Sequence, residues 1–249
     1  MRSLYNNIIK RLRGIYFYAT FFLDCIKYSR KVKQINTEAE KRKWTERKRI
    51  AHIQRLYRKW MNVVFARNSI QVTHIGVELL PDDGKCVIVA NHRSFFDIML
   101  LTPFLVINKT ISKIELSRIP YLGEIVKAGS VLVDRKSTQS KEESQRIMSL
   151  LPDQGIAGVY YPEGTRNAVA YPLLDFHPGA FMLAIKKKLP LYCAIIIGAG
   201  EVLPKNFTFT PGNVTVEIQG PFYPEEKESI KAFSKRIKKH MEKRIAELC

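Results

Sequence analysis

The stretch that decides the fold is Val87-Ile88-Val89-Ala90-Asn91-His92-Arg93-Ser94-Phe95-Phe96-Asp97, in which four apolar residues run directly into a polar turn. A short apolar run bounded by turn residues is typical of a strand buried inside a sheet. Similar runs follow along the chain, at 130–133, 156–161, 191–197 and 214–218. Helical patterns separate or follow them, at 94–106, 139–151, 179–188 and 227–247. The alternation predicts an α/β fold, with a central, mostly buried sheet flanked by helices.

Charge divides the chain into two parts. The 249 residues carry a net charge of +18, and residues 1–70 alone hold 18 Lys and Arg against 4 Asp and Glu. Residues 71–249 hold 23 against 19, so most of the positive charge lies in the first seventy residues. We predict a basic, amphipathic helical arm at 1–70 and an α/β domain at 71–249. Such a basic block indicates an anionic partner: a membrane surface, a nucleic acid or an acidic protein.

The composition of the arm favours an anionic membrane surface. Its longest apolar run, 14–26, is shorter than the roughly 20 residues of a spanning helix, and Asp24 interrupts it. Aromatic residues crowd this run and basic residues flank it, as in helices that lie in the lipid interface. A second helix is predicted from about Thr37 to Phe65, with Thr37 and Glu40 as a capping box. We expect a peripheral or monotopic protein at the cytoplasmic face of a membrane.

Two classes of partner are disfavoured by the sequence. Nucleic acid is the competitor for the basic arm, but no zinc finger, RNA-recognition signature or helix-turn-helix is found, so we expect no nucleic acid. The four cysteines, Cys25, Cys86, Cys193 and Cys249, are far apart and form no CxxC pair. We expect reduced thiols in a cytosolic environment and no metal site.

His92 and Asp97 form the candidate catalytic pair. His92 lies at the carboxyl end of an expected strand, where open α/β sheets bind ligands. Ser94 is expected to cap the following helix, with Asp97 in its first turn. Asp97 can then hold the Nδ1 proton of His92 and leave Nε2 free as a base. Because Ser94 lacks Gly-x-Ser-x-Gly surroundings, the pattern favours direct attack by a substrate hydroxyl on an acyl group.

A second polar turn, Tyr161-Pro162-Glu163-Gly164-Thr165-Arg166, follows the apolar run at 156–161. Gly164 permits a close backbone approach or a positive φ, and Arg166 offers a planar fork that suits phosphate. Glu163 is expected to orient Arg166 or to contact a hydroxyl of a sugar or glycerol. Together the two turns indicate an enzyme that activates a hydroxyl on a phosphate-bearing molecule.

The order of these motifs resembles that of the lysophosphatidate acyltransferases (1-acylglycerol-3-phosphate acyltransferases), within the glycerolipid acyltransferase superfamily. The Asn-His…Asp motif of this family reads here as Asn91-His92 with Asp97, and its aromatic-Pro-Glu-Gly-Thr-Arg motif as Tyr161 to Arg166. Three further motifs occur in the family order, as Lys113-Ile114-Glu115-Leu116, Gly129-Ser130-Val131-Leu132-Val133-Asp134-Arg135 and Leu189-Pro190-Leu191. The resemblance covers about residues 72–222.

The resemblance implies a mechanism and a set of site residues. His92 would be the general base, Asp97 would orient it, and the acceptor hydroxyl would attack an acyl-CoA or acyl-carrier-protein thioester without an acyl-enzyme. The acceptor phosphate would be bound by residues near the second turn, namely Lys113, Arg135, Glu163, Gly164, Thr165 and Arg166. No metal and no cofactor besides the acyl thioester co-substrate is implied. An acyl tunnel is implied between a helical membrane platform and the body.

The chain departs from the family pattern in three places. Tyr161 stands where the family more often has Phe, and His177-Pro178 stands where it often has lysines. The last motif lacks the second proline that is usual in its strand, and Cys193 stands near that place. These departures bear on the acceptor more than on the chemistry.

The predicted function is transfer of a fatty acyl group to the free hydroxyl of a lysophospholipid, with 1-acylglycerol-3-phosphate as the leading acceptor and phosphatidate as product. Two alternatives stay open: an acyltransferase for another lyso-lipid acceptor, and a non-catalytic membrane or nucleic-acid binding protein. The His92/Asp97 pair separates them, because a pure binding protein has no need of a base.

Overall fold

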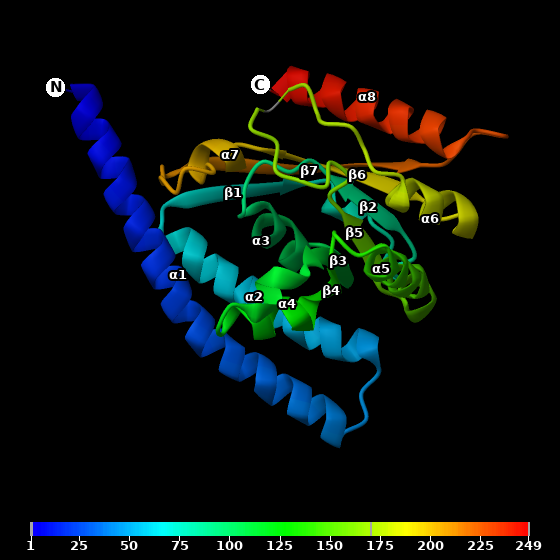
Figure 1. Ribbon diagram of the computed structural model, residues 1–249, viewed down its shortest axis with the longest axis horizontal. Coiled ribbons are helices and arrows are strands. Elements are labelled where there is room, and N and C mark those ends of the chain that lie inside the picture. The colour runs from blue at the N-terminus through cyan, green and yellow to red at the C-terminus, as the bar shows by residue number, and fades with distance from the viewer. Residues whose placement is uncertain (1, 170, 249) are drawn as a thin grey trace.

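The computed structural model describes residues 2–169 and 171–248, which form a seven-stranded mixed sheet between two layers of helices (Figure 1). The strand order is β1-β7-β6-β2-β5-β3-β4. The strands are β1 (Ile70–Ile75), β2 (Val87–Ala90), β3 (Asn108–Lys113), β4 (Ser130–Val133), β5 (Ala157–Tyr160), β6 (Leu191–Ile197) and β7 (Gly212–Phe222). Neighbours run parallel except β6 and β7, which are antiparallel. The predicted α/β class with a buried central sheet is confirmed.

Helices cover both faces of this sheet. The α-helices are α1 (Arg2–Lys41), α2 (Glu46–Arg67), α3 (Asp97–Leu101), α4 (Leu122–Gly129), α5 (Thr138–Leu150), α6 (Gly179–Lys187), α7 (Ala199–Val202) and α8 (Ile230–Leu248). Short 3-10 helices occur at Val77–Leu79, Thr102–Phe104, Ile114–Arg118 and Pro152–Gln154. Helices α1 to α4 pack on one face and α5, α6 and α8 on the other, each layer with its own apolar core.

The apolar runs in the sequence mark the central strands, and two other strands lack such a run. β2, β4 and β6 have the predicted bounds, and β5 and β7 overlap the predicted runs. β1 and β3 were not predicted. β1 lies at an edge and buries alternate residues, while β3, Asn-Lys-Thr-Ile-Ser-Lys, places polar side chains on one face. Strands of this kind lack the continuous apolar run of a strand buried on both faces.

The two N-terminal helices differ from the prediction in where they meet. α1 continues through Thr37 and Glu40 to Lys41, so the predicted helix start at Thr37 is wrong. Lys43 adopts a left-handed conformation with φ 49°, which interrupts the helical path. Thr45 then caps α2, because its side chain accepts a hydrogen bond from the backbone amide of Lys48.

Both N-terminal helices pack against the sheet domain. Phe17 of α1 is buried and stacks on Phe209, with ring centroids 5.2 Å apart. Asp24, which interrupts the apolar run, accepts hydrogen bonds from Trp60 Nε1 and from Arg67 on α2. The arm therefore shares a core with the body while another side of α1 remains exposed. None of the helices described for residues 2–169 and 171–248 is both long and apolar enough to cross a bilayer.

The cysteines within the described residues are free thiols. Cys25, Cys86 and Cys193 are all buried, and burial raises the pKa of Cys25 and of Cys86 to about 12. Each thiol is therefore protonated at neutral pH and unsuited to act as a nucleophile. Cys249 lies outside the described residues.

Candidate active site

The sheet order brings the two predicted turns together. β2 and β5 are adjacent and parallel, with Val89 opposite Tyr160, so the turns that follow them open at the same edge. The carboxylate of Glu163 lies between them and accepts hydrogen bonds at 2.9 Å from two backbone amides, those of His92 and Leu174. The amide of Asn167 donates to the carbonyl of His92 at 2.6 Å. The two turns thus form one rigid unit.

His92 and Asp97 meet as their spacing predicts. Nδ1 of His92 donates to Oδ2 of Asp97 at 2.7 Å, and the same oxygen accepts from the amides of Arg93 and Ser94 at 2.7 and 2.8 Å. The Asp97 side chain is 1% exposed and that of His92 is 16% exposed. A buried carboxylate therefore fixes one side of the imidazole, while Nε2 makes no hydrogen bond to the described residues and remains available as a base.

Ser94 does not cap the following helix, contrary to the prediction. α3 begins at Asp97, with Phe96 in the cap position. The Asp97 carboxylate folds back onto the amides of the turn and satisfies them in place of a serine cap. Ser94 Oγ instead donates to the carbonyl of Leu203 at 2.7 Å and accepts from the amide of Phe96. Ser94 is wholly buried, so its hydroxyl has a structural role.

Asn91 fastens the end of β2 to β6, a role that the sequence alone does not reveal. Its side-chain amide donates to the carbonyl of Ile196 and accepts from the amide of the same residue, both at 2.8 Å. The side chain thus continues the hydrogen-bonding pattern of the sheet after the backbone has turned away. This pairing sets the direction in which His92 leaves the strand.

Tyr161 packs against His92 of the candidate catalytic pair. Its ring lies 4.5 Å from that of His92, tilted by 38°. The hydroxyl is buried, and neither it nor Oδ1 of Asp97 has a hydrogen-bond partner among the described residues. Burial raises the pKa of Tyr161 well above its usual value, and the negative charge of Asp97 adds to this effect. Tyr161 is therefore a neutral, rigid wall of the site.

The predicted phosphate-binding residues gather at the same edge of the sheet. Arg135 follows β4 and its guanidinium donates to the carbonyl of Gly164, while burial lowers its pKa and the charge of Glu115 opposes this effect. Lys113 ends β3 and is exposed. Arg166 is half-buried, and Thr165 beside it is exposed. The carbonyl of Arg166 accepts a hydrogen bond from Lys205, a cation that sequence reasoning did not single out.

Gly164 is required by its conformation and by a close contact. Its φ is +67°, and a Cβ placed there would lie 2.6 Å from the ring of His177. The predicted interaction of Glu163 with Arg166 is not seen, because both oxygens of Glu163 accept from backbone amides and the residue is 3% exposed. Glu163 positions the turn from beneath the site.

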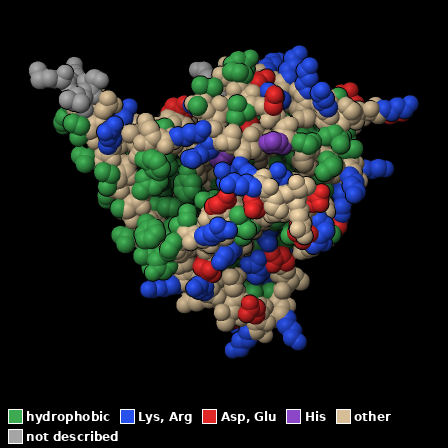
Figure 2. Space-filling model, viewed as in Figure 1, with side chains coloured by type: hydrophobic (Ala, Val, Ile, Leu, Met, Phe, Trp, Pro, Cys, Tyr) green, Lys and Arg blue, Asp and Glu red, His purple; other side chains and the backbone are tan. Residues whose placement is uncertain are grey.

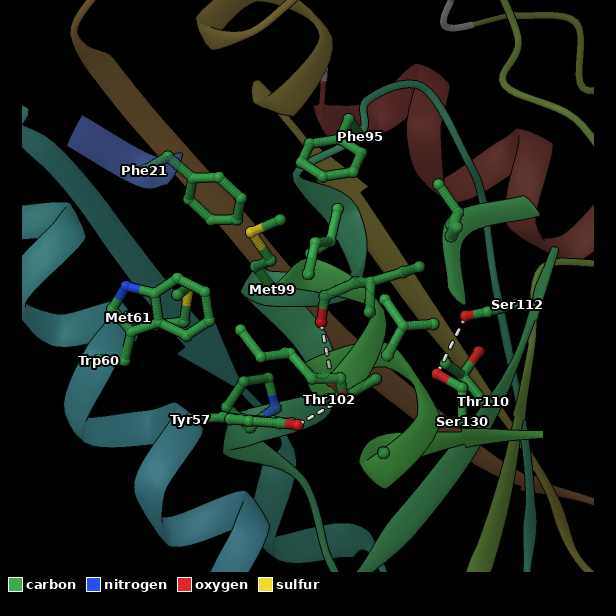
Figure 3. Close-up of a pocket in the computed structure, with 17 residues that line it drawn as sticks. Phe21, Tyr57, Trp60, Met61, Phe95, Met99, Thr102, Thr110, Ser112 and Ser130 are labelled. Atoms are coloured by element: carbon green, nitrogen blue, oxygen red, sulfur yellow. Dashed lines mark hydrogen bonds between the residues drawn. The ribbon is translucent and has the colours of Figure 1, made fainter. Parts of the chain in front are cut away.

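An apolar cavity lies beneath this edge, between the helices α2, α3 and α4 and the strands β3 and β4 (Figure 3). Phe21, Trp60 and Met99 line one side of it, and Phe95, three residues beyond His92, lies at one end. Within the described chain, no cluster of three or more His, Cys, Asp or Glu side chains is placed to hold a metal ion.

Comparison with known proteins shows what the chain is similar to. The family model described as Acyltransferase matches residues 71–197, slightly more than half of the chain. A 1-acyl-sn-glycerol-3-phosphate acyltransferase of Chlamydomonas reinhardtii is 32% identical over 164 residues, covering 63% of this chain and 48% of that protein. The beta form of the Homo sapiens enzyme is 33% identical over 148 residues, covering 56% and 51%. The chain spans about half the length of these relatives.

A solved structure extends the similarity to nearly the whole fold. The structure of PlsC, the 1-acyl-sn-glycerophosphate (LPA) acyltransferase from Thermotoga maritima, is similar with a TM-score of 0.81 and 25% sequence identity, and the match covers 97% of each chain. The similarity thus includes α1 and α2 as well as the sheet. The matched family model shows that this chain belongs to the Acyltransferase family, and the relatives and the solved structure that it resembles are 1-acylglycerol-3-phosphate acyltransferases.

Proposed function

We propose that this protein transfers a fatty acyl group from an acyl thioester to the free hydroxyl of 1-acylglycerol-3-phosphate, forming phosphatidate. The observation that carries the proposal is the 2.7 Å contact between His92 Nδ1 and the buried Asp97, while Nε2 has no hydrogen-bond partner among the described residues. The acceptor is inferred from the relatives and the solved structure, which are acyltransferases for this lysophospholipid.

The proposed reaction needs no protein nucleophile. Nε2 of His92 removes the proton from the acceptor hydroxyl, and the oxygen attacks the thioester carbonyl carbon. Asp97 stabilises the imidazolium that forms. The tetrahedral adduct then collapses, the carbon–sulfur bond breaks, and the departing sulfur takes the proton from Nε2. The products are the new ester and the free thiol of CoA or of acyl-carrier protein.

The cations at the sheet edge are proposed to bind the acceptor phosphate. Arg166 belongs to the same turn as Gly164, and Arg135 donates a hydrogen bond to the Gly164 carbonyl, so both cations belong to the surroundings of this turn. Lys113 and Thr165 lie at the same edge and complete the proposed set. Glu163 acts through the backbone of His92 as a positioning residue. The apolar cavity beneath is proposed to hold the acyl chain of the donor.

The test of the proposed function is His92→Ala. Loss of the general base is expected to lower kcat by about 10²–10⁴, while binding of the protein to lipid vesicles stays unchanged. His52→Ala is the matched control, because His52 lies on α2 and contacts the carbonyl of Lys48 away from the site. Turnover of His92→Ala at the wild-type rate would falsify the mechanism.

The arm is proposed to lie on the cytoplasmic face of an anionic membrane. Hydrophobic side chains gather along α1 in Figure 2, where they face solvent. The exposed set on this helix is Tyr5, Ile8, Leu12, Ile15, Tyr16, Phe22 and Leu23. An exposed apolar face beside many cations is what an interfacial helix presents to anionic lipid. Such an attachment would place the apolar cavity near the layer that supplies the lipid acceptor.

A further inference from the structure

One wall of the apolar cavity carries hydroxyl groups. Thr110 and Ser112 on β3 and Ser130 on β4 line the cavity, opposite Phe21 and Trp60 (Figure 3). The strands pair in parallel with Thr110 opposite Ser130, and side chains alternate along each strand, so the three hydroxyls share one face. Ser112 donates to Ser130 at 3.0 Å. The lining is otherwise largely hydrophobic, and the hydroxyls of Tyr57 and Thr102, which also line it, each donate to a backbone carbonyl.

Two of these hydroxyls have unused hydrogen-bonding capacity. Thr110 is 2% exposed, and its Oγ1 has no partner among the described residues. Ser130 accepts from Ser112, but its own proton is donated to none of the described residues. A buried hydroxyl without a partner is unfavourable because it has lost water and gained nothing in exchange. A purely hydrocarbon chain in the cavity would leave Thr110 in this state and the proton of the half-buried Ser130 without an acceptor.

The register of the strands gives the depth of these hydroxyls. Thr110 is level with Val159 on β5, and Val159 is level with Ile88 on β2. Thr110 therefore lies four residues short of the level of His92, roughly 13 Å along the strands at about 3.3 Å per residue. Ser112 is two residues nearer to the edge. An acyl chain with its thioester at His92 would meet these hydroxyls along its middle and not beside its carbonyl.

We infer that the acyl pocket accepts chains that carry a hydroxyl group near mid-chain, and that Thr110 and Ser130 recognise this oxygen. A chain hydroxyl both donates and accepts, so it can satisfy Thr110 and Ser130 together. The inference rests on the proposed function, because it takes the cavity to be the site of the donor chain. Resident water is the competing occupant, since the cavity of about 90 Å³ exceeds the roughly 10–15 Å³ that one water needs.

The experiment compares three acyl-CoA donors of equal chain length, which are unsubstituted, 3-hydroxylated and hydroxylated at mid-chain, with lysophosphatidate as acceptor. The mid-chain hydroxy donor is expected to have a kcat/KM about tenfold above that of the unsubstituted donor. The 3-hydroxy donor is expected to show no such advantage, because its hydroxyl lies beside the carbonyl.

Two variants assign the preference to the cavity wall. Thr110→Val keeps the shape of the side chain, and it is expected to remove the preference by lowering kcat/KM for the mid-chain hydroxy donor alone. Ser130→Ala is a second variant, and it is also expected to lower kcat/KM for the mid-chain hydroxy donor. Ser144→Ala is the matched control, because Ser144 is a buried serine on α5 outside the cavity. It is expected to leave the preference unchanged.

A binding measurement separates this inference from the proposed function. The three corresponding free fatty acids are titrated into the wild-type protein and Thr110→Val by calorimetry, and the same ranking is expected without any turnover. The inference is overturned if the wild-type protein binds all three acids with equal affinity, or if Thr110→Val lowers the affinity for all three equally. In either case the hydroxyls bind resident water only. If the fatty acids keep the expected ranking of affinities but no acyl-CoA donor is turned over, the proposed function alone is overturned.

Discussion

His92 is held at two points by residues that are themselves almost wholly buried. Asp97 fixes the imidazole through Nδ1, and Glu163 fixes the backbone amide of the same residue. Asn91 fastens the preceding position to β6. Because Glu163 follows β5 and the partner of Asn91 lies on β6, a small shift of either neighbouring strand end would displace His92. The rest of the site, including Arg135 and Arg166, is more exposed and less constrained.

Arg166→Ala tests the phosphate site at the level of a single residue. The KM for lysophosphatidate is expected to rise by about tenfold or more, because a charge-assisted bond to phosphate is lost. The KM for a monoacylglycerol acceptor without phosphate is expected to stay the same. Arg146→Ala on α5, where Arg146 pairs with Glu143 at the surface, is the control. An unchanged KM for lysophosphatidate would move the phosphate site elsewhere.

Tyr161→Phe tests the unpaired hydroxyl beside the catalytic pair. At pH 7 the variant is expected to gain about 1 kcal/mol in the free energy of unfolding, because a buried hydroxyl without a partner is removed. The raised pKa of Tyr161 adds a pH dependence. A group with a raised folded-state pKa contributes stability below its unfolded pKa, about 10 for tyrosine, and loses it as the pH rises above that value.

The gain in the free energy of unfolding that Tyr161→Phe brings should therefore grow between pH 7 and about pH 11. Urea unfolding at both values measures it, with Tyr223→Phe, an exposed tyrosine, as control. A variant less stable than the wild type at pH 7 would show that the Tyr161 hydroxyl makes a favourable hydrogen bond in solution.

At the scale of elements, the sequence marks buried strands better than polar or edge strands. The apolar runs fixed the bounds of β2, β4 and β6. β3 was not predicted because Thr110 and Ser112 are polar, so the strand has no continuous apolar run in the sequence. Both side chains line the cavity. The predicted start of α2 at Thr37 is wrong because Thr37 and Thr45 both fit a capping pattern, and only the packed structure shows that Thr45 is the one at a helix start.

The site itself was predictable to the extent that it is local. The spacing of His92 and Asp97 places both in one turn, so their contact follows from the sequence. The contact of Glu163 with the amide of His92 does not follow from the sequence, because it depends on β5 lying beside β2. The packing of Tyr161 on His92 depends on the same neighbour relation. Order of strands in a sheet is a property of the whole chain that single motifs do not encode.

Glu46 connects three elements at the start of α2. Its carboxylate accepts from Lys109 on β3 at 2.6 Å and from Arg49 at 2.7 Å, and Arg49 also donates to Asn36 on α1. Burial alone would raise the pKa of Glu46, but the hydrogen bonds from Arg49 and Lys109 and the charges of both lower it to about 2. The side chain is 32% exposed, so solvent screens part of this interaction.

Glu46→Gln is expected to lower the free energy of unfolding by about 1 kcal/mol at pH 7. A depressed folded-state pKa contributes stability above the unfolded pKa, about 4.3 for glutamate, and this stability is lost as the pH falls toward 2. The difference between wild type and variant should therefore shrink between pH 5 and about pH 2.5. Thermal unfolding at both values measures it, and a constant difference contradicts the role of the carboxylate charge. Glu143→Gln, at an exposed pair on α5, is the control.

At the scale of the whole molecule, two properties of the arm bear on the proposed attachment to an anionic membrane. The first seventy residues hold 18 Lys and Arg against 4 Asp and Glu, and α1 exposes a line of apolar side chains. The positive charges attract an anionic surface from a distance, and salt screens this attraction. The apolar side chains act only after contact, and salt does not screen their contribution. Binding that combines both should therefore respond to salt in part.

Co-sedimentation with vesicles separates the two contributions. Raising the ionic strength from 0.1 to 1 M shortens the Debye length from about 10 to 3 Å, and the bound fraction on anionic vesicles is expected to fall without reaching zero. Leu12→Asp and Leu23→Asp, which alter leucines 60% and 64% exposed on α1, are expected to abolish the part that resists salt. Leu150→Asp on α5, a leucine 41% exposed on another helix, is the control and should bind as the wild type. Complete insensitivity to salt would mean that apolar insertion dominates, and equal binding to an oligonucleotide under the same conditions would return nucleic acid as the partner of the arm.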